Sequence, residues 1–206
     1  YRAVYANLEP AQAARENVAM GMAAAVEHLA RGARDQIHDD RATDLAAAIL
    51  ATSSPTPPLE EFLTRWCAQS AQPTVLLLDE VDALIGDTLI ALLRQLRAGY
   101  PKRPRQFPQT VILCGVRDLR DYRIHASAEK SAITGGSAFN IKAESLRLGD
   151  FSQPEVTALL QQHTADTGQA FAPEALEAVW TLTLGQPWLV NALAYEACFR
   201  MREGRD

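Results

Sequence analysis

Two adjacent carboxylates, Asp79 and Glu80, follow directly on the apolar run Val75 to Leu78. A short continuous apolar run predicts a strand buried on both faces, as in a parallel sheet. Ligands of such sheets bind beyond the carboxyl ends of the strands. There, one carboxylate can hold a magnesium ion through water and the next can orient an attacking water, which suits nucleoside triphosphate chemistry. The alternative interpretation is a core strand that ends in a solvated acidic turn.

The elements around this pair predict an α/β fold in two parts. Residues 1–6 alternate in strand-forming types, and residues 110–114 form a second continuous apolar run. We expect helices over 11–30, 42–51 and 59–67, and another after an N-cap at Asp87. A short strand is predicted at 146–148, followed by helices over 153–166, 173–183 and 187–202. Alternating strands and helices followed by helices alone predict a parallel α/β core at 1–147 and a helical subdomain at 148–206.

Composition excludes several other classes of protein. The 206 residues are 48% hydrophobic and carry a net charge of −5, so overall charge does not favour nucleic-acid binding. The three cysteines are far apart and form no C-x-x-C pair, which argues against a disulfide framework or zinc site and for a reducing cytoplasm. No apolar run approaches the roughly 18 residues of a membrane span.

Four ordered motifs extend the interpretation. The run VLLLDEVD has the Walker B pattern in its Asp-Glu form, VILCGVRD follows it, and LRLGDFSQPEV and LGQPWLVNALAYEA lie in the helical part. In this order the motifs resemble the bacterial AAA-like ATPases, specifically the nucleotide-switch (STAND) branch. The resemblance runs from the first strand to the last helix and implies a P-loop NTPase core with a helical lid.

The resemblance also implies roles for individual residues in binding ATP and Mg²⁺ between core and lid. Asp79 would hold Mg²⁺ through water, Glu80 would polarise the attacking water, and Arg117 would sense the γ-phosphate. Gly185 and Pro187 match the G-x-P motif of the lid, whose proline packs near adenine. Simpler alternatives stay open, because Arg117 could pair with a nearby aspartate, and Gly185 and Pro187 could only end one helix and start the next.

The chain departs from the family pattern in two respects: the winged-helix segment that such proteins often carry after the lid does not appear before Asp206, and the phosphate loop is missing. It has no G-x-x-x-x-G-K-[ST] loop, which cradles phosphates in backbone N–H groups, and none of Lys102, Lys130 and Lys142 follows such a loop. The first residue is Tyr1 and the first methionine is Met20. We therefore expect an upstream P-loop in the native protein, with ATP hydrolysis there and weak or no ATP binding by these 206 residues alone.

A second hypothesis is a non-hydrolysing module that keeps the fold and binds a protein effector, a second copy of itself or nucleic acid. Five basic residues cluster without an acidic residue between Asp87 and Asp118, and could contact nucleic acid or a partner's acidic face; they are Arg94, Arg97, Lys102, Arg103 and Arg105. The more ordinary interpretation of this cluster is a solvated loop.

Overall fold

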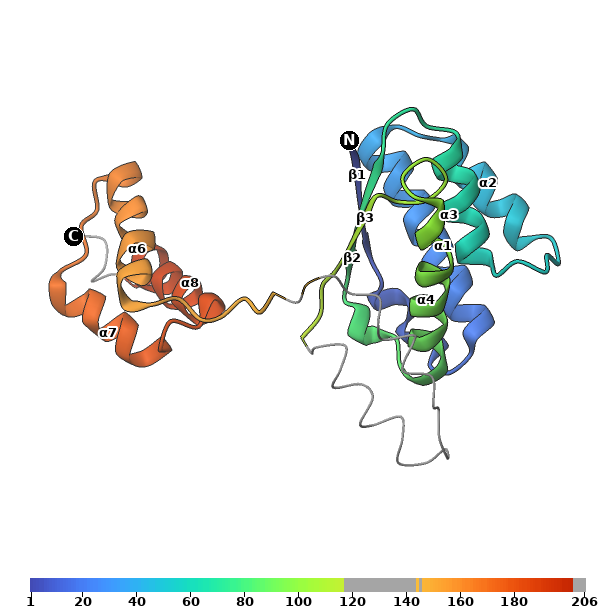
Figure 1. Ribbon diagram of the computed structural model, residues 1–206. Helices are drawn as coiled ribbons and strands as arrows, with labels where there is room; N and C mark the ends of the chain where they lie inside the picture. Colours follow the sequence, from blue (N-terminus) through green and yellow to red (C-terminus); the bar gives the residue numbers. More distant parts are fainter. Residues whose placement is uncertain (117–143, 145, 202–206) are drawn as a thin grey trace. The chain divides into compact units, whose positions relative to one another are not determined.

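The protein is described as a computed structural model covering residues 1–116, 144 and 146–201. The chain divides into two compact units, Tyr1–Ser145 and Leu146–Asp206, here called unit 1 and unit 2 (Figure 1). Unit 1 is mixed α/β and unit 2 is helical over the residues described.

Unit 1 is built on a small parallel sheet. Its strands are β1 (Arg2–Asn7), β2 (Thr74–Asp79) and β3 (Thr110–Leu113), in the order β1-β2-β3. Asn7 lies opposite Asp79, and Leu78 lies opposite Leu113. Because all three strands run in the same direction, their carboxyl ends meet at one edge, where the acidic pair lies. The predicted α/β class with a parallel sheet is confirmed.

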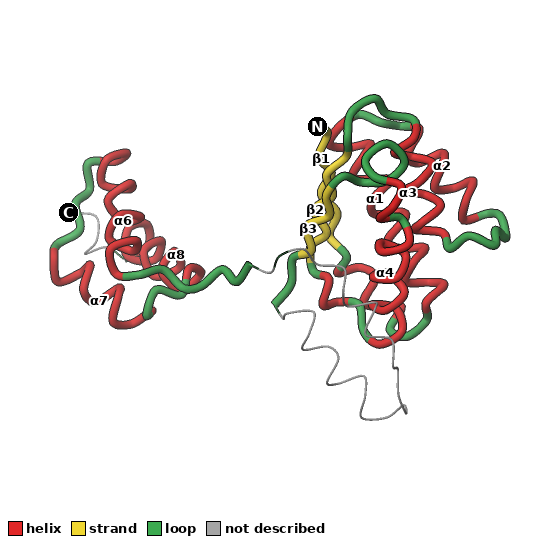
Figure 2. The backbone as a smooth tube through the Cα atoms, viewed as in Figure 1, coloured by secondary structure: helices red, strands yellow, loops and turns green. Residues whose placement is uncertain are grey.

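The helices of unit 1 lie on one side of this sheet (Figures 1 and 2). They are α1 (Val18–Ile37), α2 (Arg41–Leu50), α3 (Pro58–Ala68) and α4 (Gly86–Ala98). The apolar stripe predicted for the third helix is buried at every position, and it comprises Leu59, Phe62, Leu63, Trp66 and Cys67. The stripe packs α3 against α1, α2 and α4, and its burial contributes hydrophobic stabilisation to the helical layer.

The opposite face of the sheet is partly exposed, which corrects the prediction of strands buried on both faces. Side chains in β2 alternate between buried and half-buried, and Tyr5 and Ile112 are 43% and 45% exposed. The register places Tyr5, Leu77 and Ile112 side by side. We call the surface of Tyr5, Leu77, Asp79, Ile112 and Cys114 the open face. The apolar run therefore located the strand correctly, but it did not show whether one or both faces of the sheet are buried.

Several helix boundaries differ from prediction: α1 runs on to Ile37, α8 (Pro187–Tyr195) ends before residue 202, and two helix starts are displaced. The helix expected over 11–30 is split into a 3-10 helix, Glu9–Ala14, and α1, which begins at Val18 with Asn17 accepting a hydrogen bond from Met20 N at 3.1 Å. Arg15 between them has φ +48°, so the helical path is interrupted. The predicted cap at Asp87 is also wrong, because α4 begins at Gly86 and Asp87 lies within its first turn.

Unit 2 packs α6 (Gln153–Thr167), α7 (Pro173–Thr183) and α8 (Pro187–Tyr195) around a small core of Val156, Leu160, Val179 and Val190. A π-helical turn, Glu196–Arg200, continues α8. The predicted capping box at the start of α6 is present, with Glu155 Oε2 accepting from Ser152 N at 2.7 Å.

The strand predicted at 146–148 does not form. Leu146 and Leu148 are 80% and 86% exposed and have no regular structure. A Leu-x-Leu alternation is too short to specify a strand without a neighbouring strand to pair with.

Candidate functional site

The site forms where β2 ends, and Asp79 is its best-positioned residue. Asp79 Oδ1 accepts a hydrogen bond from Glu80 N at 2.9 Å, and Oδ2 accepts one from the Tyr5 hydroxyl at 3.0 Å. Each carboxylate oxygen has two lone pairs, so Asp79 can still accept further hydrogen bonds, for example from metal-bound water. The carboxylate is half-buried on the open face.

Tyr5 comes from the neighbouring strand and sequence reasoning did not identify it. It lies opposite Leu77, two residues before Asp79, so its ring runs along the open face toward the end of β2. The hydrogen bond to Asp79, a little burial and the negative charges of Asp79 and Glu80 raise the pKa of the Tyr5 hydroxyl. The phenol is therefore a neutral donor to Asp79 at neutral pH. Only the strand register reveals this pair, because 74 positions separate the two residues.

Glu80 turns the chain out of the strand and is exposed. Its backbone adopts the left-handed conformation, with φ +53° and ψ +42°. Such a conformation is uncommon for a non-glycine residue and persists where surrounding contacts hold it. Here Val81 N donates to Cys114 O at 3.1 Å and Ala83 N donates to Glu80 O at 3.0 Å. The result is a solvent-accessible carboxylate directly beside the oriented carboxylate of Asp79.

A third carboxylate of the same motif, Asp82, shapes the chain after β3. Asp82 Oδ2 accepts a hydrogen bond from Val116 N at 2.7 Å, and a Cβ atom at Gly115 would overlap Asp82 Oδ1. Glycine at 115 thus lets the backbone approach this carboxylate closely. Asp82 thereby fixes the segment that leads to Arg117, and the predicted sensor Arg117 itself lies outside the described residues.

The donor set suits a magnesium ion held with ATP, although it does not form a metal cage. Within the described ranges, no group of three or more His, Cys, Asp or Glu side chains could hold a metal ion. Mg²⁺ usually keeps several waters and is bound through one or two carboxylates plus substrate phosphates. Asp79, with its acceptor capacity and fixed orientation, fits that mode of binding.

Gly185 and Pro187 lie in unit 2 and have a structural explanation of their own. Gly185 has φ +81°, and a Cβ atom there would overlap the carbonyl oxygen of Phe151. Phe151 N in turn donates to Gly185 O at 2.8 Å. Pro187 is the first residue of α8, whose N-cap Gln186 accepts from Leu189 N at 2.6 Å. The turn therefore needs glycine at 185 and favours proline at 187 whether or not a nucleotide binds.

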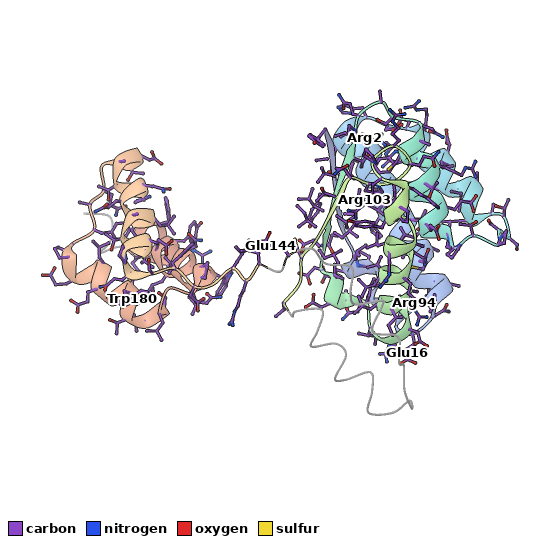
Figure 3. All side chains as sticks on the ribbon, viewed as in Figure 1. Arg2, Glu16, Arg94, Arg103, Glu144 and Trp180 are labelled. Atoms are coloured by element: carbon purple, nitrogen blue, oxygen red, sulfur yellow. The ribbon has the colours of Figure 1, made fainter. Side chains whose placement is uncertain are left out.

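The predicted basic cluster is partly neutralised in the folded chain. Lys102 Nζ lies 2.7 Å from Glu60 Oε1, and Arg103 stacks on the Tyr100 ring at 4.3 Å. Arg94 is exposed on α4 and lies well apart from Arg103 in Figure 3. No acidic residue lies near Lys102 in the sequence, but the fold brings Glu60 of α3 beside it.

No protein-family model matches the chain, and neither a curated protein nor a solved structure shows significant similarity to it. Among the described helices, none is long and apolar enough to cross a membrane.

Proposed function

We propose that this chain is part of a nucleotide-switched ATPase of the AAA-like, STAND type, in which unit 1 is the α/β layer of a P-loop NTPase core and unit 2 corresponds to the helical lid. One observation supports this proposal most strongly. Asp79 ends the middle strand of a parallel sheet with its carboxylate oriented by two donors, and the exposed carboxylate of Glu80 follows directly. Ligands of parallel sheets bind at this edge.

In the proposed reaction each carboxylate has a separate task. Asp79 would hold a magnesium ion through a water molecule, because its remaining lone pairs can accept that water's hydrogens. Glu80 accepts a hydrogen bond from the attacking water and orients it toward the γ-phosphate. Bound Mg²⁺ supplies neutralisation of the charge that develops on the phosphates.

The remaining parts of the proposal rest on the resemblance. Arg117 is assigned to the γ-phosphate, and Gly185 and Pro187 to the lid motif near adenine. Anchoring ATP also requires a phosphate-binding loop of a kind that these 206 residues do not contain.

The test is Glu80→Gln in the full-length native protein. Glutamine keeps the size of the side chain and removes the carboxylate that orients water. We expect ATP turnover to fall about 10²–10⁴-fold, as is typical for a lost general base, while ATP affinity stays within about threefold of wild type. Turnover is measured by phosphate release and affinity by equilibrium binding.

A matched control is Glu27→Gln, which changes an exposed glutamate on α1 in the same way and should leave turnover unchanged. A wild-type protein that neither binds nor hydrolyses ATP contradicts the proposal. That result would favour the non-hydrolysing module, whose partner would then be a protein effector or a second copy of the chain.

A further inference from the structure

Tyr5 is held from two directions at the edge of the sheet. Its backbone is fixed by α1, since Tyr5 N donates to Gln36 Oε1 at 2.9 Å and Gln36 Nε2 donates to Tyr5 O at 2.8 Å. Gly32 allows this close packing, because a Cβ atom there would lie 2.6 Å from Tyr5 O. One glutamine side chain thus replaces the strand that would otherwise pair with β1 at this point.

The side chain of Tyr5 is equally constrained. Its ring lies on the open face beside Leu77, and its hydroxyl reaches Asp79 Oδ2 at 3.0 Å. The other oxygen of Asp79 is held only by the N–H of the next residue, Glu80. Tyr5 is therefore the one side chain among the described residues that donates to Asp79, and two donors on different oxygens fix the plane of a carboxylate better than one.

We propose that Tyr5 is the positioning residue of the proposed site: by donating to Asp79 Oδ2 it orients the carboxylate that receives the magnesium-bound water. This inference rests on the proposed function for its role in turnover. Loss of the hydroxyl leaves the phenyl ring in place and frees one oxygen of Asp79, so the carboxylate can rotate about its last torsion, which is intrinsically broad. The site would then bind Mg²⁺ less tightly, although the reacting groups are unchanged.

The coupling runs in both directions. Metal binding beside Asp79 should change the hydrogen bond that the Tyr5 hydroxyl donates to Asp79 Oδ2. A tyrosine enriched with ¹³C at Cζ reports this change directly by NMR, and Tyr5→Phe assigns the signal because it removes it.

The experiment compares wild type, Tyr5→Phe and Tyr100→Phe in the full-length protein. Tyr100 is an exposed tyrosine of unit 1 that stacks on Arg103 and serves as the matched control. We expect Tyr5→Phe to raise the Mg²⁺ concentration at half-maximal ATP turnover three- to tenfold, with kcat at saturating Mg²⁺ within twofold. In an Asp79→Asn background, Tyr5→Phe should add no further loss, because the two residues act as one unit.

The outcomes separate this inference from the proposed function. ATP turnover with an unchanged Mg²⁺ requirement in Tyr5→Phe overturns the positioning role and leaves the ATPase proposal intact. If wild type shows no ATP turnover, the ATPase proposal fails. The NMR signal of Tyr5 then tests the positioning role by itself. A Tyr5 Cζ shift on adding Mg²⁺ with ATP, abolished by Asp79→Asn, then supports the positioning role, and the absence of any shift overturns it.

Discussion

Arg2 on β1 and Asp39 after α1 form an ion pair in which Nη1 and Oδ2 lie 3.1 Å apart and each side chain is only 9% exposed (Figure 3 labels Arg2). Trp66 Nε1 donates to the same oxygen at 3.0 Å, and Arg41 Nε donates to the other at 3.2 Å. The Arg2 guanidinium also lies 4.2 Å from the centre of the Trp66 ring. The first strand is thereby tied to the α1–α2 connection and to α3.

Asp39→Asn should destabilise unit 1 by about 3 kcal/mol at pH 7, since it leaves Arg2 without its charged partner in a buried position. Burial raises the pKa of Asp39, but hydrogen bonds from Trp66 and Arg41 and the charges of Arg41 and Arg2 outweigh it, so the pKa lies below its usual value. A lowered carboxyl pKa stabilises the fold above the unfolded-state value of about 3.9 and loses that effect as pH falls through the folded-state value. The difference between variant and wild type should therefore shrink below about pH 4.

The control for this change is Asp35→Asn. Asp35 pairs with Arg34 but its side chain is 54% exposed, so Asp35→Asn should destabilise unit 1 much less than Asp39→Asn. Urea unfolding is followed by the fluorescence of Trp66, the buried tryptophan of unit 1, with Trp180 and Trp188 replaced by phenylalanine. If the decrease in unfolding free energy caused by Asp39→Asn does not change with pH, packing and not charge explains the effect.

Gln95 on α4 caps the start of α3, which has no capping side chain of its own. Its Oε1 accepts from Leu59 N at 3.0 Å and Glu60 N at 3.2 Å, and its side chain is buried. Gln95→Leu leaves these two N–H groups without an acceptor and should lower the free energy of unfolding by about 2 kcal/mol. Gln95→Glu retains an acceptor at a helix N-terminus, so it should lower the free energy of unfolding by less than Gln95→Leu does. If urea unfolding shows equal decreases for the two variants, the capping role is contradicted.

Gly185→Ala should destabilise unit 2 more than Gly168→Ala. Both glycines have left-handed backbones, with φ +81° and +79°, so each substitution incurs about 1–2 kcal/mol of strain. Only at Gly185 would the new Cβ overlap Phe151 O, whereas nothing lies within 4 Å of a Cβ at Gly168. We expect a difference of at least about 1 kcal/mol. Thermal unfolding followed by Trp180 fluorescence measures the stability of both variants. Equal decreases in stability would contradict the packing explanation for Gly185.

Several local features could be predicted from the sequence because neighbouring residues determine them. The stripe from Leu59 to Cys67 has helical spacing, and all five of its members are buried. The capping box of Ser152 and Glu155 depends on residues within one helical turn, and it is present at the start of α6. The apolar run ending at Asp79 likewise located β2 correctly. The helix expected over 11–30 failed because Arg15 adopts a backbone conformation that helix propensity does not anticipate.

The relationships that define the candidate site were decided only by the tertiary structure. Tyr5 and Asp79 meet because β1 pairs with β2 in one particular register, and a shift of one residue would turn either side chain to the other face. Glu60 reaches Lys102 because α3 packs beside α4, so the basic cluster seen in the sequence is partly neutralised. By itself the sequence determined which residues carry charge and where most of the strands and helices form, because these depend on residue type and short-range spacing. Which of those residues face one another depended on strand register and helix packing, which act between positions far apart in the chain.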